Sequence, residues 1–501
     1  MDFKSAVAKI FSKINFNQER KWIQKPIETQ QKVFEHLINS GKSTLFGKDH
    51  RFKNIQNYED FKKNVPVRDY EALKPYIDRV IAGEHDILWK GKPIYLAKTS
   101  GTTSGTKYIP ITKESIPTHI RSARNTLLDY IWQNQHAEFV SGKMIFLQGN
   151  PELTVKNGIK IGRLSGIVAH FVPKYLQKNR LPSWETNCIE DWETKVDKIV
   201  EETIDQDMTL ISGIPPWLVM YFEKLLKKSG KQTITEIFPN LQLLVTGGVN
   251  YNPYHKKMTK LLGKKLDVLQ TYPASEGFFA YQNDLYSDDL LLLLDNGIFY
   301  EFIPADEFFN QNHTRLSLDE VETEIDYVMI ISTTAGLWAY NLGDTVRFTS
   351  LNPYKIVVSG RIKHFTSAFG EHVIAHEVEQ ALQQTLLTQA AQISEFTIAP
   401  QVNPEQGLPY HEWLIEFDKA PEQMNLFAKT LDDNLRKLNS YYDDLISGNI
   451  LKPLVIRQVK TNGFNQYMKS EGKLGGQNKV PRLANDREIA NKFYSLELIQ
   501  N

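Results

Sequence analysis

The chain of 501 residues is longer than one hydrophobic core usually organises, so two or three domains are expected. Hydrophobic residues make up 41% and charged residues 24%, and Lys plus Arg balance Asp plus Glu at 59 each, which argues against a nucleic-acid partner. The single cysteine, Cys188, excludes an internal disulfide and a cysteine-rich metal site, and we expect a reducing, cytoplasmic location.

The first stretch of the chain is predicted to form an amphipathic helix. Its apolar side chains share one face, with lysines on the other: Phe3, Val7, Ile10, Phe11 and Ile14. A peripheral membrane role and docking against the rest of the fold both fit this pattern, and we favour docking. The stretch lacks the features of a signal peptide, and nothing in the chain has the roughly 20 apolar residues that span a bilayer. We therefore expect no stable membrane insertion.

Helices and short buried strands are predicted to alternate through the first 350 residues. Helices are predicted at 27–39, 115–133, 189–204 and 216–228. Buried strands are predicted at 143–149, 209–214, 241–248 and 266–272. The leucine run at 290–295 is also strand-like, and Asn296-Gly297 after it predicts a hairpin turn into a strand at 298–304. This alternation predicts an α/β architecture with mixed sheets.

The pattern of predicted strands and helices changes beyond about residue 352. A predicted strand at 355–361 is followed by a helix at 373–386, a strand at 411–417, a helix at 421–439 and a polar tail. We therefore predict two domains: a large N-terminal α/β domain, residues 1–360, and a smaller C-terminal α+β domain, residues 361–501.

Residues 98–107, KTSGTTSGTK, form a loop dense in glycine and hydroxyl groups. The loop fails the Walker pattern, because Thr106 precedes Lys107 and Tyr108 follows it. Backbone N–H groups, hydroxyls and a lysine nevertheless suit a polyphosphate. Taken alone, the composition fits a phosphate-binding loop and a solvated surface loop equally well.

Two later stretches favour a nucleotide. TYPASEG at 271–277 follows a predicted strand, so Tyr272, Ser275 and Glu276 would lie at its carboxyl end, where a ring can stack on a base and a carboxylate can hold Mg²⁺. In YNLGDTVRF at 340–348, Gly343-Asp344 is predicted to turn between two strands, and the aspartate could accept ribose hydroxyls. An ordinary strand exit and an ordinary turn aspartate are the alternatives.

In this order and spacing the three stretches resemble those of the auxin-responsive acyl acid amido synthetases of plants and their bacterial relatives, within the adenylate-forming enzyme superfamily. Two more stretches are similar to this family: residues 360–382 to the hinge and the start of the mobile domain, and GGQNKVPRL at 475–483 to a lysine-containing loop. Thr103-Ser104, Asn341 and Leu483 depart from the plant pattern. These departures indicate a bacterial-type member, so the plant hormone substrates are not carried over.

The resemblance implies a role for each matched position. Glu276 would hold Mg²⁺, and Lys479 would be a mobile catalytic lysine. Nucleotide contacts are implied for Ser100, Thr102, Thr103, Ser104, Gly248, Val249, Tyr272, Ser275, Asp344 and Arg361. The acyl pocket would involve Pro215, Trp217 and Trp338, and the hinge Ile362 and Lys363.

The implied activity uses ATP and Mg²⁺ to convert a small-molecule carboxylic acid into an acyl-AMP, which an amino acid amine then attacks. Two alternatives stay open: an acyl-CoA ligase that uses coenzyme A as acceptor, and an adenylate-binding protein without catalysis. ATP–pyrophosphate exchange would separate the silent protein from both ligases. We expect the enzyme to act as a monomer.

Overall fold

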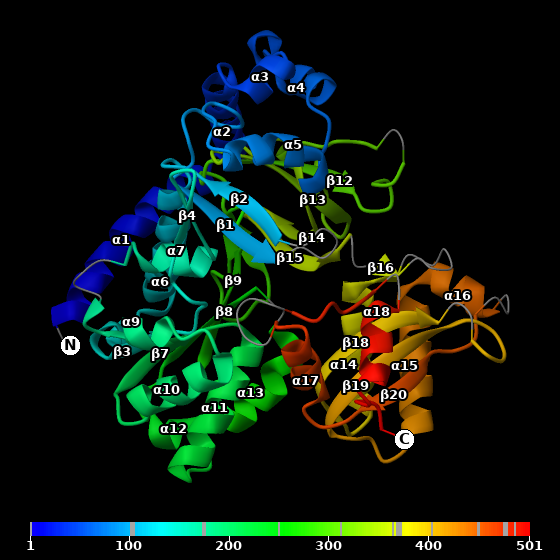
Figure 1. The fold of residues 1–501 in the computed structure, drawn as a ribbon. Helices are drawn as coiled ribbons and strands as arrows, with labels where there is room; N and C mark the ends of the chain where they lie inside the picture. Colours follow the sequence, from blue (N-terminus) through cyan, green and yellow to red (C-terminus); the bar gives the residue numbers. More distant parts are fainter. Residues whose placement is uncertain are drawn as a thin grey trace. The chain divides into compact units, whose positions relative to one another are not determined.

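The computed structural model describes residues 3–100, 106–172, 177–248, 251–310, 313–362, 365–366, 373–401, 404–447, 451–473, 479–484 and 487–500 (Figure 1). The chain divides into two compact units. The first consists mainly of Met1–Leu342 and Val346–Val357, and the second of Gly343–Thr345, Val358–Leu474 and Asn478–Asn501. Among the described helices, none is long and apolar enough to cross a membrane.

The first unit begins with helices α1(Phe3–Ile23), α2(Pro26–Gly41), α3(Leu45–Asp49), α4(Tyr58–Asn64) and α5(Tyr70–Ile81). The last three start at side chains that cap free backbone N–H groups. Thr44 accepts from the Gly47 N–H, and Asn57 and Asp69 do the same for the first turns of α4 and α5. Capping explains why helices as short as α3 and α4 form at all.

The predicted docking of α1 on the rest of the fold is confirmed, but the apolar stripe is not the docking face. The helix packs against α6(Ile116–Asn134), but the side chains that it buries are Ser5, Ser12, Asn15, Glu19 and Trp22. Hydrogen bonds hold this polar face, among them one from the Ser5 hydroxyl to the carbonyl oxygen of Ala137 at 3.1 Å. This face and the stacking of Phe16 on Trp132 attach the helix, while its apolar stripe is exposed.

A four-stranded sheet with the order β2-β1-β5-β4 carries the ends of the predicted phosphate loop. Its strands are β1(Tyr95–Ser100), β2(Thr106–Ile111), β4(Thr154–Lys156) and β5(Ile159–Gly162). β1 and β2 are antiparallel, and Ser100 lies opposite Thr106 in the register. The loop therefore joins the two strands of a hairpin.

An eleven-stranded mixed sheet forms the centre of the fold, which confirms the predicted α/β class with mixed sheets. In spatial order its strands are β12(Ile298–Pro304), β13(Asp326–Thr333), β14(Tyr340–Leu351), β15(Tyr354–Arg361), β11(Leu290–Leu292), β10(Phe278–Tyr281), β9(Asp267–Pro273), β8(Leu243–Gly247), β7(Met208–Ser212), β3(Lys143–Phe146) and β6(Arg180–Leu181). Strands β9, β8, β7, β3 and β6 pair in parallel.

Within the described residues, six α-helices lie between the strands of this sheet in the chain: α7(Leu164–Ala169), α9(Trp184–Asn187), α10(Trp192–Thr203), α11(Pro215–Ser229), α12(Ile234–Ile237) and α13(His255–Leu262). The last four supply the hydrophobic core beside the parallel strands. The four predicted helices are found as α2, α6, α10 and α11, and the four predicted strands as β3, β7, β8 and β9. As its sequence indicates, α11 starts at Pro215 and ends before Gly230, whose φ of 69° only glycine adopts easily.

The predicted hairpin through Asn296-Gly297 is wrong. β11 pairs with β10 and β15, whereas β12 pairs with β13 at the edge of the sheet. The Asn296 amide is buried and donates to the carbonyl oxygen of Phe278 at 2.9 Å. This residue therefore fastens the chain to β10 while Gly297, with φ of 70°, redirects the chain to another part of the sheet.

The second unit is an α+β structure. A sheet of order β18(Gln392–Gln401), β19(Tyr410–Lys419), β20(Val455–Val459) has a buried face lined by aliphatic and aromatic side chains. The unit's helices are α14(Ala375–Thr388), α15(Met424–Leu438), α16(Ser440–Ser447), α17(Gly463–Ser470) and α18(Glu488–Ser495), and β16(Phe365–Thr366) pairs with β17(Val373–Ile374). The predicted strands and helices of this region are found as β15, α14, β19 and α15.

Candidate active site

The carboxyl ends of the parallel strands lie along one edge of the large sheet. β3, β7, β8 and β9 point the same way and end at Phe146, Ser212, Gly247 and Pro273. Open α/β sheets bind their ligands outside this edge. Three sequence-predicted positions, Gly248, Ser275 and Glu276, follow directly after two of these strands.

Two glycines lie at this edge, Gly247 as the last residue of β8 and Gly248 directly after it. Gly248 has φ of 74°, a conformation that side chains make costly. A Cβ atom on Gly247 would lie 2.5 Å from Oγ1 of Thr271, so this position also excludes a side chain. Val249, the second predicted base-pocket residue, lies outside the described residues. Close backbone approach is what the predicted nucleotide contact at Gly248 requires.

Ser275 and Glu276 form the tip of a tight hairpin. Ala274 and Gly277 exchange two backbone hydrogen bonds, of 2.7 and 3.3 Å, so Ser275 and Glu276 are the central two of the four residues that connect β9 to β10. Ser275 is buried, and Glu276 is partly exposed. Tyr272 lies within β9, is buried, and packs on Phe279 with ring centroids 5.0 Å apart. The hairpin therefore holds the Glu276 carboxylate at the strand end where the sequence predicts it.

The structure brings Tyr340 to Glu276. The Tyr340 side chain is 1% exposed, and its phenol donates to Oε1 of Glu276 at 3.5 Å. Burial, together with the nearby Glu276 charge, raises the pKa of Tyr340 well above its usual value, so the phenol stays protonated as a donor. Tyr340 is the first residue of the YNLGD stretch, but sequence reasoning gave it no role.

Arg68 fixes the backbone on both sides of Tyr340. Its N–H donates to the carbonyl oxygen of Ala339 at 3.0 Å, and its carbonyl oxygen accepts from the Asn341 N–H at 2.7 Å. Helix α5 begins two residues later. The tyrosine that contacts Glu276 is thus held by a segment more than 250 residues away in the sequence.

The strand that follows the predicted phosphate loop, β2, is tied to α5. The Lys107 ammonium lies 5.5 Å from the centre of the Tyr70 ring, and the Tyr108 N–H donates to the Tyr70 hydroxyl at 2.9 Å. Thr102, Thr103 and Ser104 lie outside the described residues, and only the backbone of Ser100 is described. Their contacts with phosphate stay predictions.

Asp344 lies inside a strand, so the predicted Gly343-Asp344 turn is wrong. Residues 340–351 form one strand, β14, in which Gly343 has φ of 84°. The carbonyl oxygen of Gly343 accepts from the Ile362 N–H at 2.6 Å, and the Asp344 side chain is buried. Glycine thus bends the strand without ending it. Ile362 is buried, whereas the Arg361 side chain and Lys363 are outside the described residues.

Lys479 is exposed and precedes a segment that is fastened to the second unit's sheet. The carbonyl oxygen of Pro481 accepts from the Thr397 hydroxyl at 2.6 Å, and Leu483 is fully buried in the core. Arg482 forms ion pairs with Glu379 and Glu395. The lysine thus stands next to a fixed segment of the second unit.

The residues predicted for an acyl pocket lie in packed regions. Pro215 begins α11, and Trp217 is buried in the core between α10, α11 and α13. Trp338 is fully buried, its indole N–H donates to the carbonyl oxygen of Leu88 at 2.9 Å, and it packs edge-on against Phe52. These contacts explain both tryptophans as core residues, and their role toward an acid stays a prediction.

A buried lysine at the end of β3 is a feature that sequence reasoning missed. Lys195 of α10 donates to the carbonyl oxygens of Gln148 at 3.0 Å and Asn187 at 2.6 Å. Burial lowers the pKa of Lys195 to about 8. The buried amide nitrogen of Gln148 has no partner among the described residues. The three groups come from α10, from the loop after β3 and from the end of α9, so no local motif reveals them.

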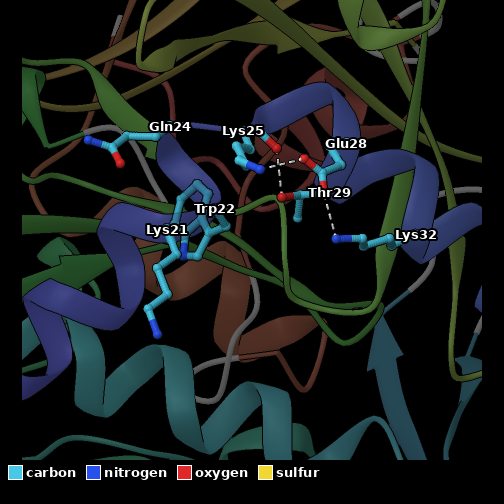
Figure 2. A pocket seen from close by; sticks show the side chains of 7 residues that line it. All are labelled: Lys21, Trp22, Gln24, Lys25, Glu28, Thr29 and Lys32. Carbon is cyan, nitrogen blue, oxygen red and sulfur yellow. Dashed lines mark hydrogen bonds and ion pairs between the residues drawn. The ribbon is translucent and has the colours of Figure 1, made fainter.

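The cavity drawn in Figure 2 lies elsewhere, where α1 ends and α2 begins. Its lining is Lys21, Trp22, Gln24, Lys25, Glu28, Thr29 and Lys32, and it includes no predicted site residue. Within the described ranges there is also no group of three or more His, Cys, Asp or Glu side chains placed to hold a metal ion. A single carboxylate such as Glu276 suits Mg²⁺, which keeps several waters and substrate phosphates as ligands.

Three family models match the chain in order. The GH3 family N-terminal domain matches residues 16–187, the GH3 family central domain residues 291–361, and the GH3 family C-terminal domain residues 375–488.

Curated proteins and solved structures give the same picture. The chain is 22% identical to jasmonoyl–L-amino acid synthetase JAR6 of Nicotiana attenuata, over 91% of this chain and 90% of the relative. It is 23% identical to indole-3-acetic acid-amido synthetase GH3.3 of Arabidopsis thaliana, over 90% and 88%.

The fold is similar to that of AtGH3.15 acyl acid amido synthetase in complex with 2,4-DB, with a TM-score of 0.81 at 16% identity, over 98% of this chain and 96% of that one. It is also similar to a 2-hydroxyisobutyryl-CoA ligase in complex with 2-HIB-AMP, with a TM-score of 0.61 at 13% identity, over 94% and 90%.

Proposed function

Because the chain belongs to the GH3 family, we propose that it is an ATP-dependent, AMP-forming ligase that joins a small carboxylic acid to the amine of an amino acid. The observation that carries the proposal is the match of all three GH3 domain models, in order, over both units. The names of the curated relatives support it, because they are amido synthetases that act on jasmonate and indole-3-acetate.

The described residues fit ATP with a magnesium ion. Gly248 has no side chain and a backbone conformation that glycine adopts most easily, and Glu276 offers a carboxylate on a rigid hairpin tip. Mg²⁺ bound with ATP would supply positive charge at the phosphates, and Glu276 would hold it there. The Tyr340 phenol, kept protonated by burial, would orient the Glu276 carboxylate.

The first step joins two anions. An oxygen of the substrate carboxylate attacks the α-phosphorus of ATP, a new acyl C–O–P linkage forms, and the bond from this phosphorus to pyrophosphate breaks. The site must supply positive charge where negative charge grows in the transition state. Lys479 would provide it beside the attacking carboxylate, and the loop hydroxyls of Thr102, Thr103 and Ser104 would hold the leaving phosphates.

In the second step, the neutral amine of the amino acid attacks the acyl carbon. The C–N bond forms, the bond from this carbon to the AMP oxygen breaks, and the amine gives up a proton. Asp344 would hold the ribose, Arg361 would lie near it, and Tyr272, Ser275, Gly248 and Val249 would line the remainder of the nucleotide site.

Coenzyme A is the alternative acceptor, because the adenylation half-reaction is common to both classes and the fold resembles a CoA ligase. The match of the GH3 C-terminal domain over residues 375–488 favours the amino acid. An adenylate-binding protein without catalysis is disfavoured by the retention of Glu276 and Lys479.

One assay separates these functions. Acid-dependent exchange of labelled pyrophosphate into ATP is measured across aryl, indole and aliphatic carboxylates. For each active acid, an amino acid mixture or coenzyme A is then added, and the products are identified by mass spectrometry. We expect exchange with at least one acid and an amide product. Absence of exchange with every acid would exclude both ligases, and a thioester without an amide would replace the amino acid by coenzyme A.

A further inference from the structure

Helix α1 exposes an apolar stripe that the fold does not use. Phe3, Ile10, Phe11 and Ile14 are 80%, 62%, 57% and 49% exposed. They lie on the face opposite to the buried Ser5, Ser12 and Glu19, and the spacing of three, four and seven residues aligns them along the helix. A cluster of large exposed apolar side chains on one element marks a surface that meets another apolar surface.

The helix is attached without this stripe. Its inner face is joined to α6 through Glu19, which accepts hydrogen bonds from Trp22 at 3.0 Å and Asn125 at 2.8 Å. Further along, Phe16 stacks on Trp132 of α6 with ring centroids 4.9 Å apart. These contacts fix the direction in which the stripe points, so substitutions on the stripe leave the helix in place.

Positive charge is concentrated around the stripe. α1 contains five basic residues, Lys4, Lys9, Lys13, Arg20 and Lys21, and one acidic residue, the buried Glu19. The whole chain has zero net charge, so this excess is local.

The same helix leads into the cavity of Figure 2, which adds Lys25 and Lys32. Glu28 pairs with both of these lysines, at 3.0 and 2.7 Å, so the cavity with Lys21 retains a net positive charge. A surface that binds anionic lipid needs apolar side chains that enter the membrane and basic side chains that attract the headgroups. The stripe supplies the first, and its lysines together with the basic cavity supply the second.

We propose that the exposed face of α1 binds an anionic membrane surface, with Phe3, Ile10, Phe11 and Ile14 entering the headgroup boundary and the cavity of Lys21, Lys25 and Lys32 receiving a lipid phosphate. A second copy of the chain is the less suitable occupant, because pairing two such helices would bring their lysines together. A protein partner would need an acidic surface with an apolar centre. The bilayer satisfies both requirements, and the helix lies on it without crossing.

The test is co-sedimentation of the full chain with vesicles of phosphatidylcholine alone and with one quarter phosphatidylglycerol. The double variant Ile10→Glu/Phe11→Glu replaces two apolar side chains of the stripe by negative charges. The double variant Lys21→Gln/Lys25→Gln removes two positive charges from the cavity. The matched control is Leu387→Glu, a 74% exposed apolar residue on α14. We expect binding to the anionic vesicles only, at least tenfold weaker binding for each double variant, and unchanged binding for the control.

Several results would overturn the proposal: no binding to anionic vesicles, equal binding to both lipid mixtures, or full binding by Ile10→Glu/Phe11→Glu. A dimer in light scattering that this variant converts to a monomer would assign the stripe to a second copy instead. Circular dichroism and thermal melting of each variant verify that it is folded. Pyrophosphate exchange in the absence of vesicles should be the same for all of them, which keeps this test independent of the proposed activity.

Discussion

At the scale of single residues, the most specific prediction concerns the pair Glu276 and Tyr340. Glu276→Gln keeps the size of the side chain but removes the charge that would hold Mg²⁺. Because the residue is partly exposed at a hairpin tip, the fold should survive. We expect the magnesium concentration for half-maximal pyrophosphate exchange to rise at least tenfold. Tyr340→Phe removes only the hydroxyl that donates to Glu276 at 3.5 Å, so it should raise this magnesium concentration by less. Wild-type exchange by Glu276→Gln at every magnesium concentration would exclude it as the ligand.

Lys479 is the second residue whose role can be isolated. Lys479→Ala should slow adenylation by about 10²–10³-fold, as the loss of one preorganised electrostatic contact does elsewhere. Amide formation from preformed acyl-adenylate should be almost unchanged, since the charge is needed only in the first step. Lys473→Ala, an exposed lysine shortly before it, is the control. Equal loss in both half-reactions would contradict the role assigned to Lys479.

Sequence reasoning located Glu276 but not its partner. A carboxylate directly after a buried strand can be recognised from local pattern alone. The contact with Tyr340 exists because Arg68 fixes the start of β14, and such long-range pairing leaves no trace in either segment. The same holds for Lys195, whose acceptors belong to a loop and to another helix.

At the scale of elements, local signals predicted helices and strands well but not their partners. α11 has a proline start and a glycine end, and it was found where expected. Asn296-Gly297 has the composition of a hairpin turn, yet the buried amide of Asn296 bonds to β10, and β12 pairs elsewhere. The apolar stripe of α1 predicted a docking face, but the helix is fixed by polar contacts on its other side. Local composition therefore predicts whether a segment is a helix or a strand more reliably than it predicts which other element that segment contacts.

The contact between α1 and α6 makes the stability of the first unit depend on pH. Burial raises the pKa of Asp129 to about 7; a hydrogen bond from Gln133 opposes the shift and the Glu19 charge adds to it. Burial also raises the pKa of Glu19 to about 7, with Asp295 adding to the shift and Trp22, Arg121 and Asn125 opposing it. Both groups thus bind protons more tightly when folded, so stability is lost as pH rises from about 4 to 7.

Asp129→Asn removes one of these charges while keeping its size. We expect the variant to melt about 2–6 °C higher than the unmodified chain at pH 8, and the difference to shrink steadily down to about pH 4, where the aspartate is protonated in the folded state and partly protonated in the unfolded state. Differential scanning fluorimetry over this pH range is the measurement. An equal effect at both pH values would show that the charge of Asp129 does not control the stability.

At the scale of the whole molecule, the sequence predicted a change of architecture near residue 360, and the chain forms two compact units. The two units are not separated at a single point of the chain. Gly343–Thr345 is grouped with the second unit, because Gly343 is hydrogen-bonded to Ile362. A strand shared in this way could not be foreseen, since YNLGD reads as a local turn. We retain 1–360 and 361–501 as the proposed functional domains.

The two-step reaction places different demands on the second unit, because Lys479 is needed in adenylation and should be absent when the amine attacks. We therefore predict that the part after residue 360 rotates about Ile362 and Lys363 between the steps, since hinges lie at the ends of elements, here the end of β15. Lys363→Pro fixes φ at this point and should slow overall turnover by about tenfold or more. Gln406→Pro, in the exposed loop between β18 and β19, is the control for proline itself. The two half-reactions of Lys363→Pro are measured separately, by pyrophosphate exchange and with preformed acyl-adenylate. If both half-reactions and the overall turnover keep the rates of the unmodified chain, the pivot does not lie at Lys363.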